Sequence, residues 1–220
     1  MSDSNVPDPS TASSGFDAIA QPWQIRAARR SDVDPLAEIL ASSFHSKEGI
    51  GRWFYPMLKA TLREDLRGRL QNGGTYYRCL VAVSTTASPS NTTPQEEVLG
   101  TLEIGLKPQF SLPWYHWFKL FPYISNVAIA HAHRRRGVAI DLLRACEPIA
   151  RQWGYHDLYL HVLENNQAAR RLYSKAGFRF CQVEMNLPSL VLGQPRQLLL
   201  HKGIPIQQPM EANRTGSLST

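Results

Sequence analysis

Residues 126–139 read Asn126-Val-Ala-Ile-Ala-His-Ala-His-Arg-Arg-Arg-Gly137-Val-Ala139, and they decide the fold because they join a strand, a basic turn and a helix start. The apolar first half is typical of a buried strand, and the apolar residues after Gly137 recur at helical spacing. The first turn of a helix leaves four backbone N–H groups free and carries about half a positive charge. We therefore expect this helix start to bind an anion such as a pyrophosphate.

The side chains around the turn fit the same anion. Gly137 leaves room for a close approach of the backbone, and Ala139 keeps the next helical turn small. Positive charge comes from Arg134, Arg135 and Arg136. An arginine run is also typical of a solvated face or of nucleic-acid contact, but no zinc-finger, RNA-stacking or helix-turn-helix pattern accompanies it. A dinucleotide fold is a further alternative, but its Gly-x-Gly-x-x-Gly pattern is absent, and we expect no nucleic-acid partner.

Hydrophobic periodicity on either side of this stretch predicts one domain over residues 23–203. Residues 1–22 and 204–220 have the composition of disordered tails. Strands are expected at 23–28, 76–83, 98–106, 123–130, 156–162, 178–184 and 197–202, and helices at 31–44, 52–70, 137–153 and 166–175. This order is typical of an α/β or α+β domain with a mixed sheet and helices on both faces.

Three residues predict where helices begin, end or bend. Ser31 is expected to cap the first helix, and Gly154 is expected to end the third as its C′ residue. Pro148 removes one hydrogen bond from that third helix at a cost of about 3 kcal/mol. We therefore expect a kink at Pro148 or a helix shortened at one end.

The composition narrows the class of protein. The chain has 220 residues, of which 43% are hydrophobic, enough for one buried core, and no run is long enough for a membrane span. Residues 1–22 contain no lysine or arginine, unlike a targeting segment, so the cytoplasm is the expected location. The net charge of +6 suits an anionic ligand or an acidic surface. Buried free thiols, rather than a metal site, are expected for Cys79, Cys146 and Cys181.

A second element follows the first at residues 159–178, which read Tyr-Leu-His-Val-Leu-Glu-Asn-Asn-Gln-Ala-Ala-Arg-Arg-Leu-Tyr-Ser-Lys-Ala-Gly-Phe. Together the two elements closely resemble the GCN5-related N-acetyltransferase (GNAT) superfamily. Its Q/R-x-x-G-x-G/A loop matches Arg134 to Ala139. Its N-x-x-A-x-x-L-Y…G-F element matches Asn166, Ala169, Leu172, Tyr173, Gly177 and Phe178. The resemblance is strongest over residues 123–180, and the element order extends it to roughly residues 23–203.

The resemblance implies an acetyl-CoA-dependent N-acetyltransferase with a mixed, mostly antiparallel sheet of about six to seven strands between helices. The pantetheine arm would lie along Val127, Ala128 and Ile129, and Asn166 would bind the carrier near its middle. The pyrophosphate would be cradled by Arg134, Arg135, Arg136, Gly137, Val138, Ala139 and Ile140. Tyr173 would lie by the sulfur and protonate the leaving thiolate. The alternative for Tyr173 is an aromatic side chain packed on a short helix.

The acceptor amine must be neutral to react, so the site needs a base. At about pH 7.5 a lysine costs about 4 kcal/mol to deprotonate, whereas an α-amine costs less than about 1 kcal/mol. His161 suits the α-amine, because it is a mild base on the strand that should border the carrier. In protein N-terminal acetyltransferases of the superfamily, Leu-His-Val or Leu-Glu-Val occupies this position. A histidine hydrogen-bonded within the sheet is the alternative, and Glu103 is the competing base.

The identity of the amine that accepts the acetyl group is the property that the sequence indicates least directly. The sequence is similar to plastid and cyanobacterial members of the superfamily, which acetylate protein N-termini and lysines, so a protein or peptide amine is expected. A small-molecule amine is an alternative, and a non-catalytic acyl-CoA sensor is another, against which Tyr173 and His161 argue. The aromatic segment 107–123 is expected to pack over the sheet edge. The alternatives are a substrate wall, a dimer surface and a contact with a membrane surface through residues 110–123.

Overall fold

The computed structural model describes residues 22–44, 51–86, 95–108, 120–184 and 195–205. The disorder expected for residues 1–22 and 204–220 falls almost wholly outside these ranges. Residues 109–119, the centre of the aromatic segment, also lie outside them.

Within these ranges the chain forms seven strands and four α-helices in the expected order. The strands are β1 (Gln24–Ala27), β2 (Tyr77–Thr86), β3 (Gln95–Pro108), β4 (Leu120–Ile129), β5 (Asp157–Leu163), β6 (Arg179–Glu184) and β7 (Gln197–Gly203). The helices are α1 (Val33–Phe44), α2 (Gly51–Asn72), α3 (Val138–Gln152) and α4 (Gln167–Lys175). Short 3-10 turns precede α1 and α3 as η1 (Arg30–Asp32) and η2 (His131–His133).

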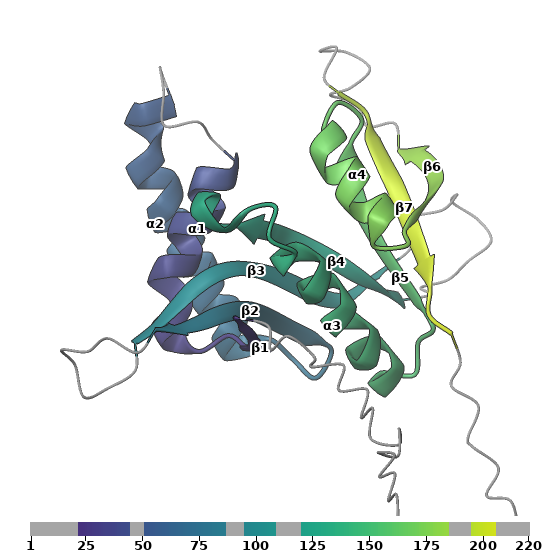
Figure 1. Cartoon of the computed structure of the whole chain (residues 1–220), viewed down its shortest axis with the longest axis horizontal. Coiled ribbons are helices and arrows are strands. Elements are labelled where there is room, and N and C mark those ends of the chain that lie inside the picture. The colour runs from purple at the N-terminus through teal and green to yellow at the C-terminus, as the bar shows by residue number, and fades with distance from the viewer. Residues whose placement is uncertain (1–21, 45–50, 87–94, 109–119, 185–194, 206–220) are drawn as a thin grey trace, which may run out of the picture.

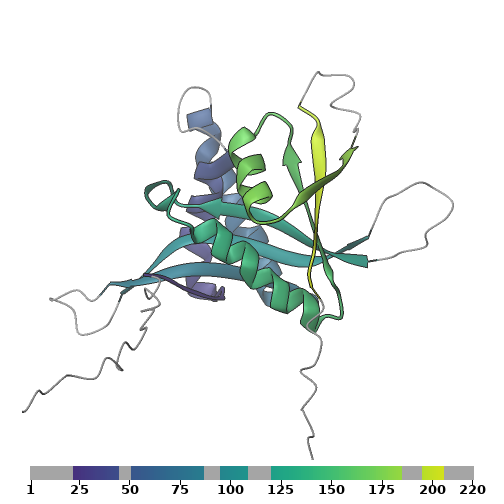
Figure 2. The same ribbon diagram turned by 45° about the vertical axis from the view of Figure 1, so that its right-hand side comes forward.

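All seven strands form one sheet in the order β1-β2-β3-β4-β5-β7-β6. Neighbouring strands are antiparallel except β4 and β5, which are parallel. Figures 1 and 2 show α1 and α2 on one side of the sheet, with α3 and α4 on the other. The predicted fold, a mixed and mostly antiparallel sheet with helices on both faces, is confirmed.

Alternation along the strands builds two hydrophobic cores, one on each face. On β2, Leu80 and Ala82 pack with Leu142 of α3, whereas Val81 packs with Leu36 of α1. The core under α3 continues into β5 and β7 and ends at Ile204, which is 4% exposed. The sheet is therefore buried on both sides where the helices cover it.

A bulge bends β4 near its middle. Between the pairs Thr101↔Ala128 and Glu103↔Ser125, β4 contains one residue more than β3. Asn126 lies in this bulge with a φ of 53°, a left-handed conformation that asparagine tolerates better than most residues. A bulge of this kind bends its strand and increases the local twist, so it turns β4 away from its other neighbour.

β4 and β5 are joined over a short length only. Their ladder contains the pairs Tyr123↔Tyr159 and Ile124↔Leu160, and no later pair is formed by the described residues. Figure 1 shows the two strands running apart beyond that point. Because β4 leads into α3 and β5 leads into α4, the starts of both helices border the opening between the strands.

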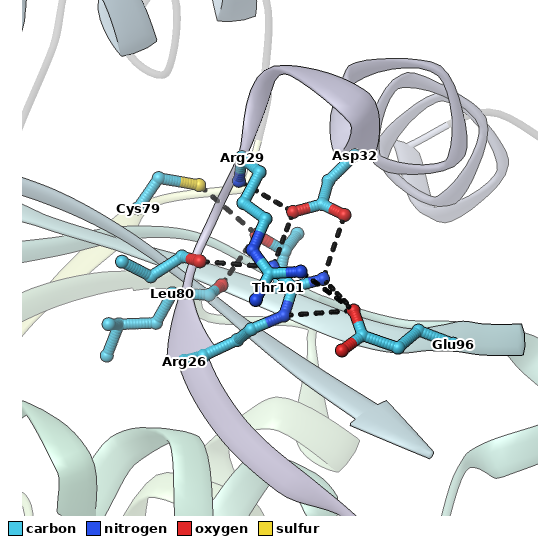
Figure 3. Close-up of polar contacts among 8 residues, drawn as sticks. Arg26, Arg29, Asp32, Cys79, Leu80, Glu96 and Thr101 are labelled. Atoms are coloured by element: carbon cyan, nitrogen blue, oxygen red, sulfur yellow. Dashed lines mark hydrogen bonds and ion pairs between the residues drawn. The ribbon is translucent and has the colours of Figure 1, made fainter. Parts of the chain in front are cut away.

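The start of α1 differs from the expected Ser31 cap. The N-cap residue is Arg29, and Asp32 is the third residue of the 3-10 turn, whose carboxylate reaches back and accepts a hydrogen bond of 2.6 Å from the backbone N–H of Arg29. Its two oxygens also accept hydrogen bonds of 2.7 and 3.0 Å from the guanidinium of Arg26 (Figure 3). Ser31 lies inside the 3-10 turn, where its hydroxyl does not cap the helix. The buried carboxylate of Asp32, paired with the guanidinium of Arg26, therefore stabilises this turn, and the hydroxyl of Ser31 does not.

The end of α3 agrees with expectation at Gly154. Gly154 has a φ of 83°, and α3 ends at Gln152. The expected shortening of the helix at Pro148 is wrong, because the helix continues four residues past it.

The three cysteines differ in burial. Burial is confirmed for Cys79 and Cys146, but Cys181 is exposed because β6 is the edge strand of the sheet.

Candidate active site

The turn before α3 presents a row of free backbone N–H groups. Arg135 has a φ of 62° and Gly137 a φ of 97°, so left-handed residues recur along the turn. Such alternation curls successive N–H groups into a concavity that binds anions. The N–H groups of Arg134 and Ile140 are bonded to nearby carbonyls, but those of residues 135–139 donate no such bond within the described chain. The donors that a pyrophosphate needs are therefore available here.

The backbone conformation of Gly137 gives a second reason for glycine, beside the expected approach of a ligand. A Cβ at this position would lie 3.9 Å from Trp23 Cζ2, an ordinary contact, so space alone does not demand glycine. Its positive φ does, because residues with a Cβ adopt this conformation only with strain. Arg134 closes the turn by donating from Nε to the Ile129 carbonyl at 3.2 Å. Arg135 and Arg136 are exposed and form no ion pair with the described residues.

The three expected carrier residues of β4 lie along the opening. Ala128 and Ile129 pair with β3 on one side, but no ladder covers the β5 side of residues 125–129. Backbone groups directed to that side must find hydrogen-bond partners elsewhere. A ligand with amide groups, laid along Val127, Ala128 and Ile129, would supply such partners. The residues present therefore fit a pantetheine arm.

α4 positions Asn166 and Tyr173 at the other border of the opening. Asn166 caps the helix, and its Oδ1 accepts a hydrogen bond of 3.1 Å from the N–H of Ala169. Its amide NH₂ remains available to a ligand. Tyr173 is 7% exposed and packs edge-on against Phe178. Burial, and to a smaller extent the nearby Tyr123, raises the pKa of the Tyr173 phenol to about 12.

His161 is joined to a tyrosine across the opening. Leu160 and Val162 point into the core under α3, so strand alternation directs His161 to the opposite face. There its Nδ1 lies 2.8 Å from the hydroxyl of Tyr123 on β4. Its Nε2 lies 2.9 Å from Oε2 of Glu184 on β6. The contact between Tyr123 and His161 stands at the point where β4 and β5 separate.

Glu103, the competing base, is paired with an arginine through one of its two oxygens, and its Oε1 is buried without a hydrogen bond in the described chain. It is 2% exposed, and its Oε2 accepts a hydrogen bond of 2.6 Å from Arg69 of α2. The structure therefore brings His161 together with Tyr123 and joins Glu103 to α2 instead. Tyr123 was not among the expected catalytic residues. The signal that could have identified it is its place three residues before Asn126, at the start of the strand that the sequence predicts at 123–130.

These features suit one class of protein, an enzyme that uses an anionic carrier. The model of the acetyltransferase (GNAT) family matches residues 42–178, and the chain belongs to this family. It is an acetyl-CoA-dependent N-acetyltransferase, with acetyl-CoA as the co-substrate.

Two relatives from Arabidopsis thaliana illustrate the similarity. The chain is 28% identical to GCN5-related N-acetyltransferase 10, chloroplastic, over 82% of this chain and 72% of that relative. It is 33% identical to GCN5-related N-acetyltransferase 7, chloroplastic, over 50% of this chain and 37% of that relative. Among solved structures, Arabidopsis thaliana NAA60 in complex with acetyl-CoA has a TM-score of 0.60 at 18% identity, over 83% of this chain and 98% of that one. This last likeness shows a shared fold.

The comparisons overturn the expected location. The cytoplasm was inferred from the composition of residues 1–22, but the Arabidopsis relatives are chloroplastic proteins. The lack of basic residues in one short segment was therefore a poor guide to the compartment. Among the described helices, none is long and apolar enough to cross a membrane.

Proposed function

We propose that this enzyme acetylates the α-amine of protein or peptide N-termini, with His161 and Tyr123 removing the amine proton. The observation that carries the proposal is the 2.8 Å contact between Tyr123 Oη and His161 Nδ1 at the opening between β4 and β5. A phenol and an imidazole in this contact can pass a proton from the opening to the ring. The amine then attacks the acetyl carbonyl as a neutral nucleophile.

The strength of this base favours an α-amine as the acceptor. An imidazole, with an ordinary pKa of about 6.5, deprotonates an α-ammonium with a pKa of about 8 at a cost of about 2 kcal/mol. The same transfer from a lysine, with a pKa of about 10.4, costs about 5 kcal/mol. Lysine side chains and small amines of high pKa would therefore be slower acceptors, unless the site desolvates their ammonium groups.

Tyr173 is proposed to stabilise the thiolate that leaves when the acetyl group is transferred. Its phenol, with a pKa raised to about 12 by burial, remains protonated at any ordinary assay pH. Full transfer of that proton to a thiolate of ordinary basicity, whose thiol has a pKa of about 8.5, would be uphill by about 5 kcal/mol. A hydrogen bond donated to the developing charge is therefore the better description of its role.

Three acceptors tested with acetyl-CoA separate the alternatives. The first is a lysine-free peptide with a free N-terminus, the second is an N-terminally blocked peptide with one lysine, and the third is a polyamine. Release of free thiol gives the rate, and mass spectrometry locates the acetyl group. We expect the first peptide to react at least tenfold faster than the other two, in kcat/KM. A preference for the blocked lysine peptide or the polyamine would refute the α-amine assignment.

The variants of the proposed base complete this test. His161→Gln and Tyr123→Phe should each lower kcat/KM for the α-amine peptide by about a hundredfold, the low end for general base catalysis. Binding of acetyl-CoA, measured by calorimetry, should change little, because neither side chain belongs to the carrier loop. A wild-type protein that binds acetyl-CoA but acetylates none of the three acceptors would favour the sensor instead.

A further inference from the structure

We propose that Glu184 of β6 is a positioning residue that fixes the tautomer of His161, forming a Tyr123–His161–Glu184 relay. The inference rests on the proposed function, in which His161 accepts the amine proton. β6 is the edge strand of the sheet, and β7 lies between it and β5. Glu184 therefore reaches His161 from two strands away, past Leu199 of β7, which pairs with His161.

The environment of the ring leaves Nε2 dependent on Glu184. The side chain of His161 is 20% exposed, and Nε2 is buried without a well-directed hydrogen bond in the described chain. Oε2 of Glu184 lies 2.9 Å from Nε2, close enough for an ion pair. The Glu184 side chain is 39% exposed, so it can rotate to direct an oxygen at the ring. A buried polar atom left without a partner costs about 1–3 kcal/mol, which favours that rotation.

The hydrogen-bonding capacity of Glu184, His161 and Tyr123 determines which atom of each group carries a proton. A carboxylate can only accept hydrogen bonds, so the ring atom that contacts Glu184 must carry a proton. The neutral imidazole then has its proton on Nε2 and its lone pair on Nδ1. Nδ1 in turn accepts the hydroxyl proton of Tyr123 at 2.8 Å. The Tyr123 oxygen has two lone pairs, one of which lies within reach of the backbone N–H of His161, and the other can receive a proton from the acceptor amine.

The proton balance of the relay is complete without any other reagent. The ammonium gives one proton to the oxygen of Tyr123, and the hydroxyl proton of Tyr123 passes to Nδ1 of His161. Tyr123 ends neutral, the amine ends neutral, and the positive charge moves to the ring, where the carboxylate of Glu184 stabilises it. The same logic assigns a carboxylate to the imidazole in a serine protease, where it holds the tautomer without taking the proton.

Other charges near the relay come from three further elements. Lys107 of β3 lies over the Tyr123 ring, with Nζ 3.7 Å from its centre, and burial lowers the pKa of this lysine. Arg69 of α2 and Glu103 of β3 act on Lys107 in opposite directions. Tyr173 of α4 approaches Tyr123 from the other side of the sheet. Among these described groups, Glu184 is the carboxylate that contacts the ring itself.

Kinetics of Glu184→Gln test the relay. An amide can donate to Nε2 as well as accept from it, so this variant no longer imposes one tautomer. We expect kcat/KM for the α-amine peptide to fall about tenfold, less than for His161→Gln, because Glu184 is half exposed and screened by solvent. The acidic limb of the pH–rate profile should move to lower pH, because the carboxylate no longer stabilises the protonated ring. Glu184→Asp, which keeps the charge, should recover part of the rate.

Asp157→Asn is the matched control. Asp157 Oδ1 lies 2.6 Å from Nε2 of His201, so it also forms a carboxylate–imidazole pair that involves β5, without contact to Tyr123. Its kcat/KM and acidic limb should match those of the wild type. Equal losses in both variants would mean that the charge of the surface matters and the relay does not.

Nitrogen NMR of the imidazole supplies a readout independent of activity. In the wild type with a neutral ring, Nε2 should carry the proton and Nδ1 should have the shift of an acceptor. In Glu184→Gln the signals should move toward a mixture of tautomers. A wild-type ring protonated on Nδ1 would overturn the relay, as would a Glu184→Gln enzyme with an unchanged profile and unchanged tautomer. A wild type that acetylates no amine would instead refute the proposed function, whatever the tautomer.

Discussion

Tyr173 of α4 is a buried residue, and this burial limits what its hydroxyl can do as an acid. The side chain is 7% exposed, and its hydroxyl makes no hydrogen bond with the described residues. A neutral phenol with a pKa raised to about 12 is a poor proton donor but a good hydrogen-bond donor. The catalytic contribution of this hydroxyl therefore depends on the negative charge that develops on the carrier sulfur only as the thiolate leaves.

Replacing Tyr173 by phenylalanine keeps the ring and removes this donor. We expect kcat to fall about tenfold to a hundredfold, in the range of a lost hydrogen bond to developing charge. Acetyl-CoA affinity and melting temperature should hardly change, since the ring packing against Phe178 is retained. Steady-state kinetics and calorimetry measure these quantities, and Tyr76→Phe, an exposed tyrosine packed on Trp153, is the control. A wild-type kcat in a chemistry-limited assay would mean that the hydroxyl has no role.

Single residues differ in how far the sequence could predict them. Tyr173 and Asn166 stand in a patterned helix, so their place at the opening follows from the spacing once the family is suspected. Tyr123 does not stand in such a pattern, because its partner His161 is 38 residues away and the two meet only through the parallel pairing of β4 and β5. The Arg69–Glu103 pair joins a helix to a strand in the same way, so nothing local revealed that Glu103 was engaged.

At the scale of elements, the start of α1 depends on a small buried charge cluster. Asp32 is 5% exposed and binds both Arg26 and the backbone of Arg29. Burial alone would raise the pKa of Asp32, but its hydrogen bonds to Arg26 and Arg29 outweigh burial, so the net pKa is lowered. Asp32→Ala leaves a largely buried guanidinium with Glu96 alone, so the free energy of unfolding should fall by about 2–4 kcal/mol.

The pH dependence of this cluster has a definite sign. Because folding lowers the pKa of Asp32, its contribution is complete above the unfolded value of about 4 and is lost as pH falls through the folded value. Urea denaturation should therefore show a constant difference between wild type and Asp32→Ala from about pH 7 to 5, and a smaller one below about pH 4. Asp34→Ala, which removes an exposed partner of Arg63 from the first turn of α1, should cost less than about 1 kcal/mol. A difference that grows on acidification would contradict the assignment.

The two ends of α3 allow a matched test of the carrier loop. Gly137 and Gly154 both have positive φ and flank the helix, and neither has an atom close enough to block a Cβ. Glutamate at either position adds the same strain and the same charge, but only at Gly137 does the carboxylate face the free N–H groups of the turn. Calorimetry should show at least tenfold weaker coenzyme A binding for Gly137→Glu, about 1.4 kcal/mol, and unchanged binding for Gly154→Glu. Equal affinities of the two variants for coenzyme A would mean that the pyrophosphate does not bind at this turn.

The elements themselves were predictable where one period dominates the sequence. α3 and β5 carry unbroken helical and alternating patterns, and their boundaries agree with the structure within one residue. The bulge at Asn126 could not be predicted, because it depends on the register of β3 against β4 and not on the composition of β4. Ser31 was misassigned as the cap because serine is a good cap residue by type, whereas the turn begins one residue earlier, after Arg29, and is held by the contacts of Asp32 with Arg26 and with the backbone of Arg29.

At the scale of the whole molecule, the sheet consists of two parts with few direct links. β1 to β4 form one continuous antiparallel ladder, and β5, β7 and β6 form another. Between them stand two pairs of residues, Tyr123↔Tyr159 and Ile124↔Leu160, together with the core under α3. A carrier laid in the opening would contact β4 and the α3 turn on one side and α4 on the other. It would thus join the two parts where the sheet leaves them separate.

Acetyl-CoA should therefore stabilise the molecule and protect the edges of the opening. Saturation at about a hundred times the Kd adds about 2.7 kcal/mol, which corresponds to about 5–10 °C in the melting temperature of a domain of this size. Hydrogen exchange should slow most in residues 125–129 and 161–163, which lack ladder partners between β4 and β5, and least in β1 and β2. Gly137→Glu should lose both effects at the same concentration. A rise in melting temperature with uniform protection, or with none at residues 125–129, would mean that the carrier binds outside the opening.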